Sequence, residues 1–242
     1  MFDRIAVKAQ GKEAFKKNYW PSVAVAFIMS LLLGGTGGAV SNATSSVPDT
    51  TQVHYEVSGD LDAAIDAITP EQAVLIIGAI AGVLMTILAI SSIIRIVLFN
   101  PITVGGNHFF KKNVRGESPT VGTIVDGFSP YAHVVVTMLL KDVFVALWSL
   151  LLIVPGVIKS YEYRLVPYLV KDHPELKPME VLKLSSRMMQ GNKWAAFVMD
   201  LSFLGWLILG IFTFNLGNIF WTFPYQDNAD AALYEELCRQ NA

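Results

Sequence analysis

Four long apolar stretches constrain the fold of this chain more than any other feature. They occupy residues 20–40, 73–98, 134–158 and 195–223. About 20 consecutive apolar residues cross a bilayer as an α-helix, because the hydrocarbon core is about 30 Å thick and each residue adds about 1.5 Å. The last stretch is too long for one simple crossing. The sequence therefore predicts an all-α, polytopic transmembrane helix bundle.

The composition supports this class and excludes others. Hydrophobic residues make up 53% of the chain and charged residues 16%, whereas an ordinary soluble domain has about 25% charged residues. The net charge of −2 gives no bulk attraction for nucleic acid. One cysteine, Cys238, excludes a disulfide or a cysteine-based metal site within one chain. The four histidines are scattered without ligand spacing, so no metal and no cofactor is expected.

The distribution of lysine and arginine predicts which side of the membrane each loop occupies. Residues 41–71 contain six acidic residues and neither lysine nor arginine, whereas residues 1–19 and 171–194 each carry five basic residues. Basic segments remain in the cytoplasm. We therefore expect a cytoplasmic amphipathic arm over residues 1–19, an acidic external loop over 41–71 and a basic cytoplasmic loop over 171–194. The apolar start resembles a cleaved signal peptide, but its length favours an uncleaved first helix.

The same rule sets the number of crossings. A single crossing between residues 131 and 158 would place the basic segment 171–194 outside, so a second, more polar crossing is expected between Gly156 and Val170. The last apolar stretch divides likewise near Asn215-Leu216-Gly217. The prediction is one integral membrane domain, residues 1–242, with about six helices as three hairpins and both termini in the cytoplasm.

Prolines recur at matching places in the three predicted hairpins. Pro155-Gly156 suits an external turn, because proline ends a helix and glycine accepts positive φ. Each returning helix carries a proline, which is expected to kink it where neighbouring groups satisfy the freed carbonyl. These prolines are Pro101, Pro167 and Pro224. A spacing of roughly 80 residues between hairpins suggests an internal repeat, a common device in membrane folds.

Several charged residues fall within the predicted crossings. Ionisable groups at bilayer depth are costly and usually face a bundle interior, where they pair. Lys159 and Glu162, three residues apart on one helix, can meet. Three interpretations remain open: salt bridges that fix helix register, a polar cavity for a solute, a peptide or a lipid headgroup, and a proton relay. The candidate intramembrane polar cluster consists of Lys141, Asp142, Lys159, Glu162, Arg164 and Asp200.

Ordered motifs over residues 100–237 resemble an uncharacterised bacterial integral membrane family, domain of unknown function 975. The motifs are Leu147-Trp148-Ser149-Leu150-Leu151, Pro155-Gly156-Val157-Ile158-Lys159-Ser160-Tyr161, Gly191-Asn192-Lys193-Trp194, Asp200-Leu201-Ser202-Phe203-Leu204-Gly205-Trp206 and Pro224-Tyr225 followed by Tyr234-Glu235. The resemblance implies a multi-pass plasma-membrane protein, typically of Gram-positive bacteria, distantly similar to the membrane domain attached to some glycerophosphodiester phosphodiesterases. It implies no activity, so no catalytic residue is carried over.

No enzyme motif accompanies these features. The sequence has no H-E-x-x-H, no G-x-S-x-G and no Walker loop, so a non-enzymatic protein without catalytic residues is expected. A membrane scaffold or accessory protein is the first hypothesis. A transport or export component for a small solute, lipid or peptide, working through a polar intramembrane cavity, is the second. The expected partners are the lipid bilayer and a membrane protein, either a different one or a second copy; nucleic acid is not expected.

Overall fold

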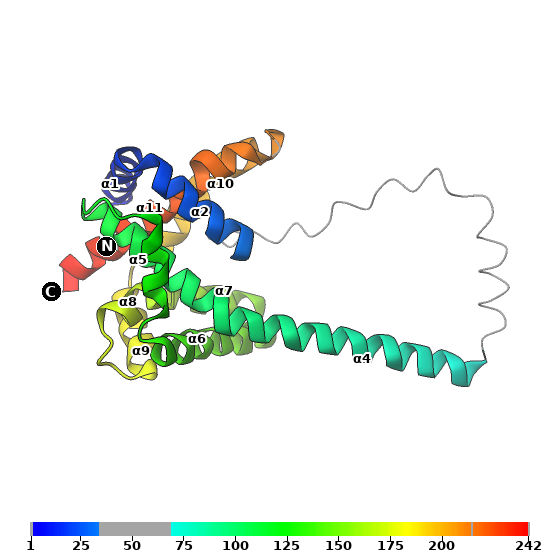
Figure 1. Cartoon of the computed structure of the whole chain (residues 1–242). Coiled ribbons are helices and arrows are strands. Elements are labelled where there is room, and N and C mark those ends of the chain that lie inside the picture. Colours follow the sequence, from blue (N-terminus) through cyan, green and yellow to red (C-terminus); the bar gives the residue numbers. More distant parts are fainter. Residues whose placement is uncertain (1, 34–68, 214, 242) are drawn as a thin grey trace. The chain divides into compact units, whose positions relative to one another are not determined.

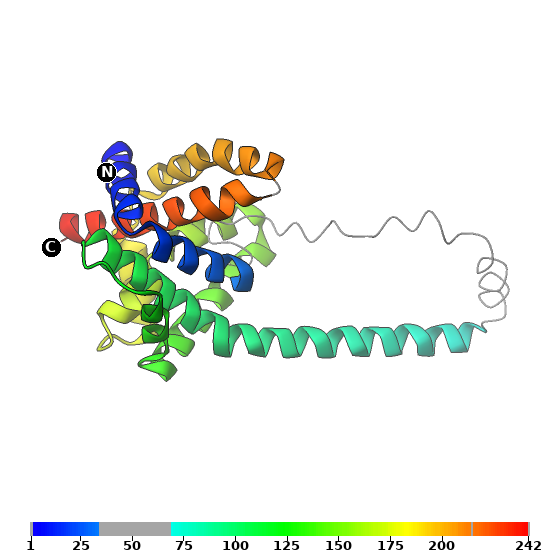
Figure 2. The ribbon, with the colours of Figure 1, turned by 45° about the horizontal axis from the view of Figure 1, so that its top comes forward.

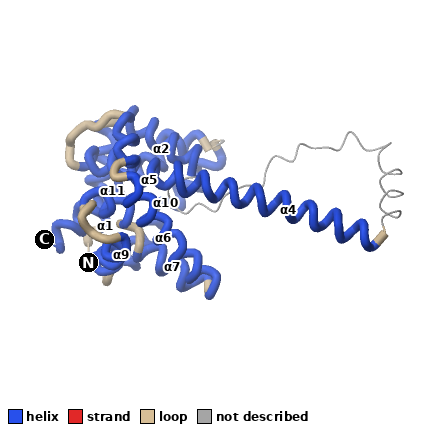
Figure 3. The backbone as a smooth tube through the Cα atoms, turned by 60° about the horizontal axis from the view of Figure 1, so that its bottom comes forward, coloured by secondary structure: helices blue, strands red, loops and turns tan. Residues whose placement is uncertain are grey.

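The computed structural model describes residues 2–33, 69–213 and 215–241, and these are helices joined by short connections, without a strand (Figures 1 and 3). They divide into two units, one formed by residues 1–39 with 96–242 and the other by residues 40–95. The helical segments are α1 (Arg4–Lys17), α2 (Tyr19–Leu33), α4 (Pro70–Ile94), η1 (Arg95–Phe99), α5 (Asn100–Val114), η2 (Val121–Phe128), α6 (Tyr131–Leu151), α7 (Ile153–Glu162), α8 (Val166–Asp172), α9 (Pro178–Met188), α10 (Lys193–Phe212), η3 (Asn218–Thr222) and α11 (Phe223–Asn241).

The described part of the smaller unit is the helix α4. It begins with a reciprocal cap: the Gln72 backbone N–H donates to Thr69 Oγ1 at 3.3 Å, and the Thr69 N–H donates to Gln72 Oε1 at 3.1 Å. Such a cap satisfies backbone donors that the first helical turn leaves free. Its apolar side chains are largely exposed. The predicted acidic loop, residues 41–71, lies outside the described residues except for its last three.

The larger unit contains three antiparallel helix pairs. In the first, α2 runs against α5, with Asn113 bonded to Ser22 and Gly106 against Met29. In the second, α7 and α8 together run back along α6. In the third, η3 and α11 run back along α10, and the two limbs lie side by side in Figure 2. The predicted antiparallel pairing of segments is present in the second and third pairs, whereas most of the first predicted returning segment, residues 73–98, belongs to the smaller unit.

The second pair is closed by contacts at both of its ends. A Cβ added to Gly156 would lie 2.7 Å from Ser149 Cα, so the two limbs touch through backbone near their connection. At the other end the Lys171 ammonium donates to the Ser129 carbonyl at 2.6 Å. The returning limb of α7 and α8 together therefore runs along α6, although α7 alone is only 10 residues long.

The position of the turn corrects the prediction. The chain leaves α6 at Leu152, whose backbone is extended (φ −157°, ψ 141°), and α7 begins at Ile153. Pro155 and Gly156 are helical residues in the first turn of α7, not a loop between helices. Proline is tolerated there because the first-turn N–H groups have no partner inside the helix.

The three returning prolines occupy the same local position. Pro101, Pro167 and Pro224 are each the second residue of a new helical segment, in α5, α8 and α11. A π-helical segment precedes the first and the third, and a turn over residues 163–165 precedes the second. Proline cannot donate a backbone hydrogen bond and clashes with the carbonyl four residues earlier. At the first and third prolines a π-helical segment runs directly into the new helix, whereas at the second a turn separates two helices.

The apolar face of the N-terminal arm packs inside the protein. Val7 and Phe15 on α1 are fully buried, and Gly11 allows α1 to touch the backbone of α11 at Ala229. The arm predicted over residues 1–19 therefore uses this face for protein packing, which leaves mainly its charged face on the surface.

Three described helical stretches are long and apolar enough to cross a membrane: Glu71–Val114, Tyr131–Leu151 and Lys193–Phe212. Tyr19–Leu31 is apolar but shorter. With 10 residues, α7 spans only about 15 Å, so the predicted fourth crossing is a broken limb made of α7 and α8 rather than one helix. Six crossings with cytoplasmic termini stay a prediction.

Candidate functional site

Arg164 forms the centre of an ion cluster between the second and third helix pairs. It lies in the turn between α7 and α8, and its guanidinium binds both carboxylate oxygens of Asp200 on α10, at 2.6 and 2.7 Å. The same guanidinium donates to Asp230 on α11 at 2.6 Å. Tyr161 also donates its hydroxyl to Asp200, at 2.8 Å. One cation is thus held by two carboxylates, and three helical segments are joined at one point.

Glu162, two residues before Arg164 at the end of α7, forms a second cluster. Its carboxylate accepts hydrogen bonds from Lys159 on its own helix at 2.6 Å and from Ser186 on α9 at 3.2 Å. It also pairs with Lys193 at the start of α10. The Lys159 contact has the three-residue spacing that allows side chains on one helix to meet. Lys193 and Ser186 come from other segments, so the cluster fastens α9 and α10 to α7.

Lys141 and Asp142, the remaining predicted cluster residues, lie together on α6. Their side chains form an ion pair at 3.4 Å, and Asn100 at the start of α5 donates to Asp142 at 3.3 Å. These residues are partly exposed and belong to neither the Arg164 nor the Glu162 cluster. The six predicted residues therefore occupy three separate groups rather than one site.

A fourth polar group, centred on Asp172, was not predicted. Asp172 at the end of α8 pairs with the buried Lys111 of α5 and accepts a hydrogen bond from Tyr234 of α11 at 2.6 Å. The Tyr234 ring stacks on Tyr168, with centroids 4.8 Å apart. Burial opposes ionisation of Asp172, but the hydrogen bonds from Lys111 and Tyr234 outweigh it and lower the pKa of the carboxyl. The group joins the three helices that follow the returning prolines.

The Asp172 group predicts an acid-sensitive contribution to stability. Because the folded pKa is below the unfolded value of about 3.9, the stabilisation is complete above about pH 5 and is lost as the pH falls through the folded pKa. Asp172→Asn should therefore be less stable than the parent protein at pH 7, and this gap should shrink at about pH 3. Thermal unfolding of detergent-solubilised protein at both pH values measures it.

Glu117→Gln is the matched control, because that exposed carboxylate lies outside the cluster. A stability gap for Asp172→Asn that is equally large at pH 7 and pH 3 would contradict the assigned role of the Asp172 carboxylate.

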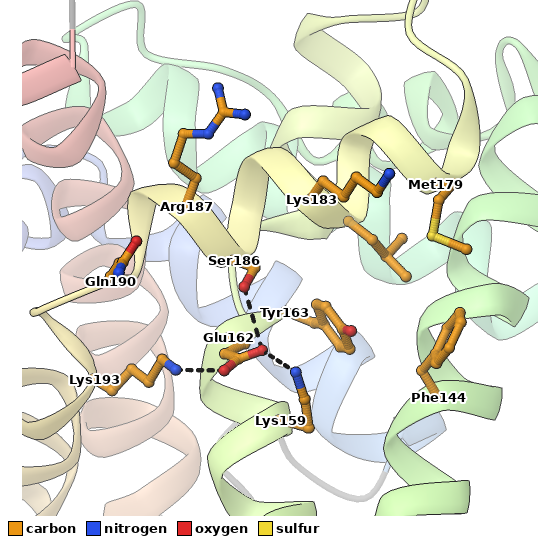
Figure 4. Close-up of a pocket in the computed structure, with 11 residues that line it drawn as sticks. Phe144, Lys159, Glu162, Tyr163, Met179, Lys183, Ser186, Arg187, Gln190 and Lys193 are labelled. Atoms are coloured by element: carbon orange, nitrogen blue, oxygen red, sulfur yellow. Dashed lines mark hydrogen bonds and ion pairs between the residues drawn. The ribbon is translucent and has the colours of Figure 1, made fainter.

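A pocket opens beside the Glu162 cluster, with a volume of about 550 Å³ (Figure 4). Its walls come from α6, α7, α9 and the start of α10. Lys159, Lys193 and Ser186 point toward Glu162, whereas Lys183 and Arg187 extend from α9 away from it. Four basic side chains and one carboxylate line the pocket, which gives the lining a net charge of +3.

Sequence reasoning missed the partners that come from distant segments. Lys193 was predicted in the basic loop and Asp230 was not among the predicted cluster residues, yet both complete ion clusters. Their signal was weak, because each partner is more than 30 residues away from the residue it binds. Lys183 and Arg187 carried a readable signal: four residues apart on one helix, they present two cations on one face.

No arrangement of side chains indicates a metal site in the part of the chain that the structure describes. Among these residues, histidine, cysteine, aspartate and glutamate side chains form no group that could hold a metal ion. The ion clusters contain cations and carboxylates that satisfy each other. What the arrangement can do chemically is hold helices together and present positive charge at the pocket.

Residues 138–241 match the family described as protein of unknown function (DUF975). The match covers the second and third helix pairs from within α6 to the end of α11, and therefore includes the Arg164 and Glu162 clusters and the pocket. No curated protein and no solved structure matches the chain. The family predicted from the sequence is confirmed over this segment, whereas the similarity to phosphodiesterase membrane domains stays a prediction.

Proposed function

We propose that this chain, which belongs to the DUF975 family over residues 138–241, is a multi-pass integral protein of the plasma membrane that acts as a scaffold or accessory protein without catalysis. The observation that carries the proposal is the internal pairing of its interior charges. Arg164 is held by two carboxylates, and Glu162 by two ammonium groups. Charges paired in this way fix the helices that carry them relative to one another, because removing one partner would leave the other uncompensated.

Embedding in a lipid bilayer is supported by the surfaces of the second and third helix pairs. Residues 143–158 and 201–226 contain no charged side chain. At the connected ends of these pairs, Leu150, Ile153 and Phe212 are 84%, 80% and 79% exposed. Soluble monomers rarely expose apolar patches larger than a few hundred Å². A hydrocarbon environment covers such surfaces without cost.

The alternative, a transport or export component, has one observation in its favour. The second returning limb is interrupted by a turn just before Pro167, and broken helices are typical of transporter binding sites. In this chain, however, the interruption at residues 163–165 holds Arg164 in a closed ion cluster. A transport function requires that the cluster residues be dispensable for folding and essential for solute movement. The accessory role requires instead that the cluster residues be essential for folding.

The topology is tested with single cysteines in a Cys238→Ser background. Leu152 and Leu216 are exposed at the connected ends of the second and third pairs, and Glu175 is exposed at the opposite end of the second pair. A membrane-impermeant maleimide should label Leu152→Cys and Leu216→Cys on intact cells. It should label Glu175→Cys only after the cells are permeabilised, because the basic loop remains in the cytoplasm.

Two outcomes would contradict this topology. Labelling of Glu175→Cys on intact cells would reverse the orientation. Leu152→Cys that is protected on intact cells while Leu216→Cys is labelled would mean that the second pair enters the membrane without crossing it. Gel mobility after denaturing labelling is the control, since it verifies that each cysteine reacts when the chain is unfolded.

A further inference from the structure

The pocket between α6, α7 and α9 has more positive charge than its own carboxylate can neutralise. Glu162 is already bound by Lys159 and Lys193. The structure gives Lys183 and Arg187 no ion-pair partner among the described residues, and both line the pocket (Figure 4). Two like charges four residues apart on a helix repel each other. Such a pair gains stability when an anion lies between or beside the two cations.

Part of the remaining pocket wall is apolar and continues into the surface that would meet lipid. Phe144 and Met179 line the pocket, and Met179 is exposed. Trp148 contacts the pocket residue Lys159, whose ammonium lies 5.4 Å from the centroid of the Trp148 ring. Trp194, which follows the pocket residue Lys193, is 70% exposed. Exposed tryptophans of this kind are enriched where the hydrocarbon core meets the headgroups.

We propose that this pocket binds the phosphate-bearing headgroup of an anionic phospholipid. Lys183 and Arg187 contact the phosphate oxygens, and Lys193 and Lys159 contribute charge from the pocket floor. The acyl chains lie along Phe144, Met179 and Trp148. Basic pockets between membrane helices on the cytoplasmic side recognise anionic headgroups in this way. Arginine is suited to the role because its planar guanidinium binds two phosphate oxygens at once.

A lipid fits these observations better than an acidic protein segment. The pocket is small, about 550 Å³, and its charged and apolar walls are adjacent, which matches a headgroup joined to its chains. The assignment rests on the proposed membrane embedding, because only an embedded pocket meets lipid from the side. It deepens the accessory role by naming the molecule that such a protein would hold.

The test measures binding of fluorescently labelled phosphatidylglycerol and phosphatidylcholine to the purified full-length protein in uncharged detergent micelles. The parent protein should prefer phosphatidylglycerol. Lys183→Gln with Arg187→Gln should weaken phosphatidylglycerol binding about 10-fold or more and leave phosphatidylcholine binding unchanged, because each cation near an anionic lipid contributes substantially. Lys12→Gln with Lys16→Gln is the matched control, since it removes the same charge from the exposed face of α1.

Separate arms distinguish the sources of the signal. An equal loss in both double variants would mean bulk electrostatic attraction and would overturn the pocket assignment. Competition by inorganic phosphate at micromolar concentration, with the same variant sensitivity and no preference between the two lipids, would overturn the lipid source. Stronger displacement of phosphatidylglycerol by an acidic peptide than by a second lipid would contradict a lipid ligand. The pocket would then be assigned to a protein partner.

Extraction of cell membranes with alkaline carbonate distinguishes a failure of the headgroup proposal from a failure of the proposed membrane embedding. A chain released by carbonate would contradict embedding itself. A chain that stays in the membrane but binds both lipids equally would contradict the headgroup site alone. An unchanged melting temperature of both double variants verifies that their folds are intact.

Discussion

Arg164→Ala should cause most of the protein to disappear from the membrane fraction. The substitution removes the only cation that binds Asp200 and Asp230 in the described structure, and these side chains are 25% and 15% exposed. Removing one partner of a buried ion pair costs about 3–5 kcal/mol, because the remaining charge is left uncompensated. A typical domain has only about 5–15 kcal/mol of total stability. Abundance and melting temperature of a fluorescent fusion measure the loss.

Arg239→Ala is the matched control for this substitution. Arg239 pairs with Glu236 on α11, but its side chain is 63% exposed. Exposed ion pairs contribute about 0–1 kcal/mol, so the abundance of this variant should be close to that of the parent protein. The comparison separates loss of an arginine from loss of the interior cluster.

A triple variant distinguishes a structural cluster from a functional one. Arg164→Met combined with Asp200→Asn and Asp230→Asn removes all three charges, while the amide oxygen introduced at position 200 can still accept the Tyr161 hydroxyl. If the cluster is structural, abundance should recover substantially, since a neutral set leaves no unpaired charge behind. If Arg164→Ala retains full abundance and melting temperature, the cluster does not hold the fold. The transport alternative would then become the better explanation.

Local features were predictable from the sequence because they depend on spacing along one helix. Lys159 and Glu162 meet because they are three residues apart, and this contact is present. The long apolar stretches and the prolines of the returning limbs were likewise readable from the sequence, because each affects only the few helical turns around it. The turn between α6 and α7 was placed about three residues too late, because proline ends a preceding helix but also fits the first turn of a new one.

The partners of the interior charges were not predictable, because helix packing selects them. Arg164 binds Asp200 and Asp230, which are 36 and 66 residues away. The cost of ionisable groups at bilayer depth indicates that they pair but not which residues pair. The Asp172 group was missed for the same reason: Lys111, Asp172 and Tyr234 come from three helices, and only their packing brings them together.

Gly105→Ala should be the most destabilising single-methyl substitution at the contact between α5 and η2. An added Cβ would lie 1.8 Å from the Ile124 carbonyl oxygen and 2.6 Å from its carbon, so the backbone itself must move. Gly127 on η2 faces the same contact, and a Cβ there would lie 2.0 Å from the Pro101 carbonyl oxygen. Overpacking a close contact costs about 1–3 kcal/mol or more. Thermal unfolding in detergent measures the loss.

Two further glycine substitutions serve as controls, because the loss of stability should depend on which atoms the new methyl group contacts. At Gly106 the nearest atom is the Met29 sulfur, at 2.0 Å, and a flexible side chain can move aside, so Gly106→Ala should cost less than Gly105→Ala. At Gly205 on α10 nothing lies within 4 Å. Gly205→Ala should therefore be neutral or slightly stabilising, because alanine favours a helix by about 1 kcal/mol over glycine. Equal melting temperatures for Gly105→Ala and Gly205→Ala would mean that α5 and η2 do not touch through backbone. The packing that brings Pro101 and the returning limb of the first pair into place would then need revision.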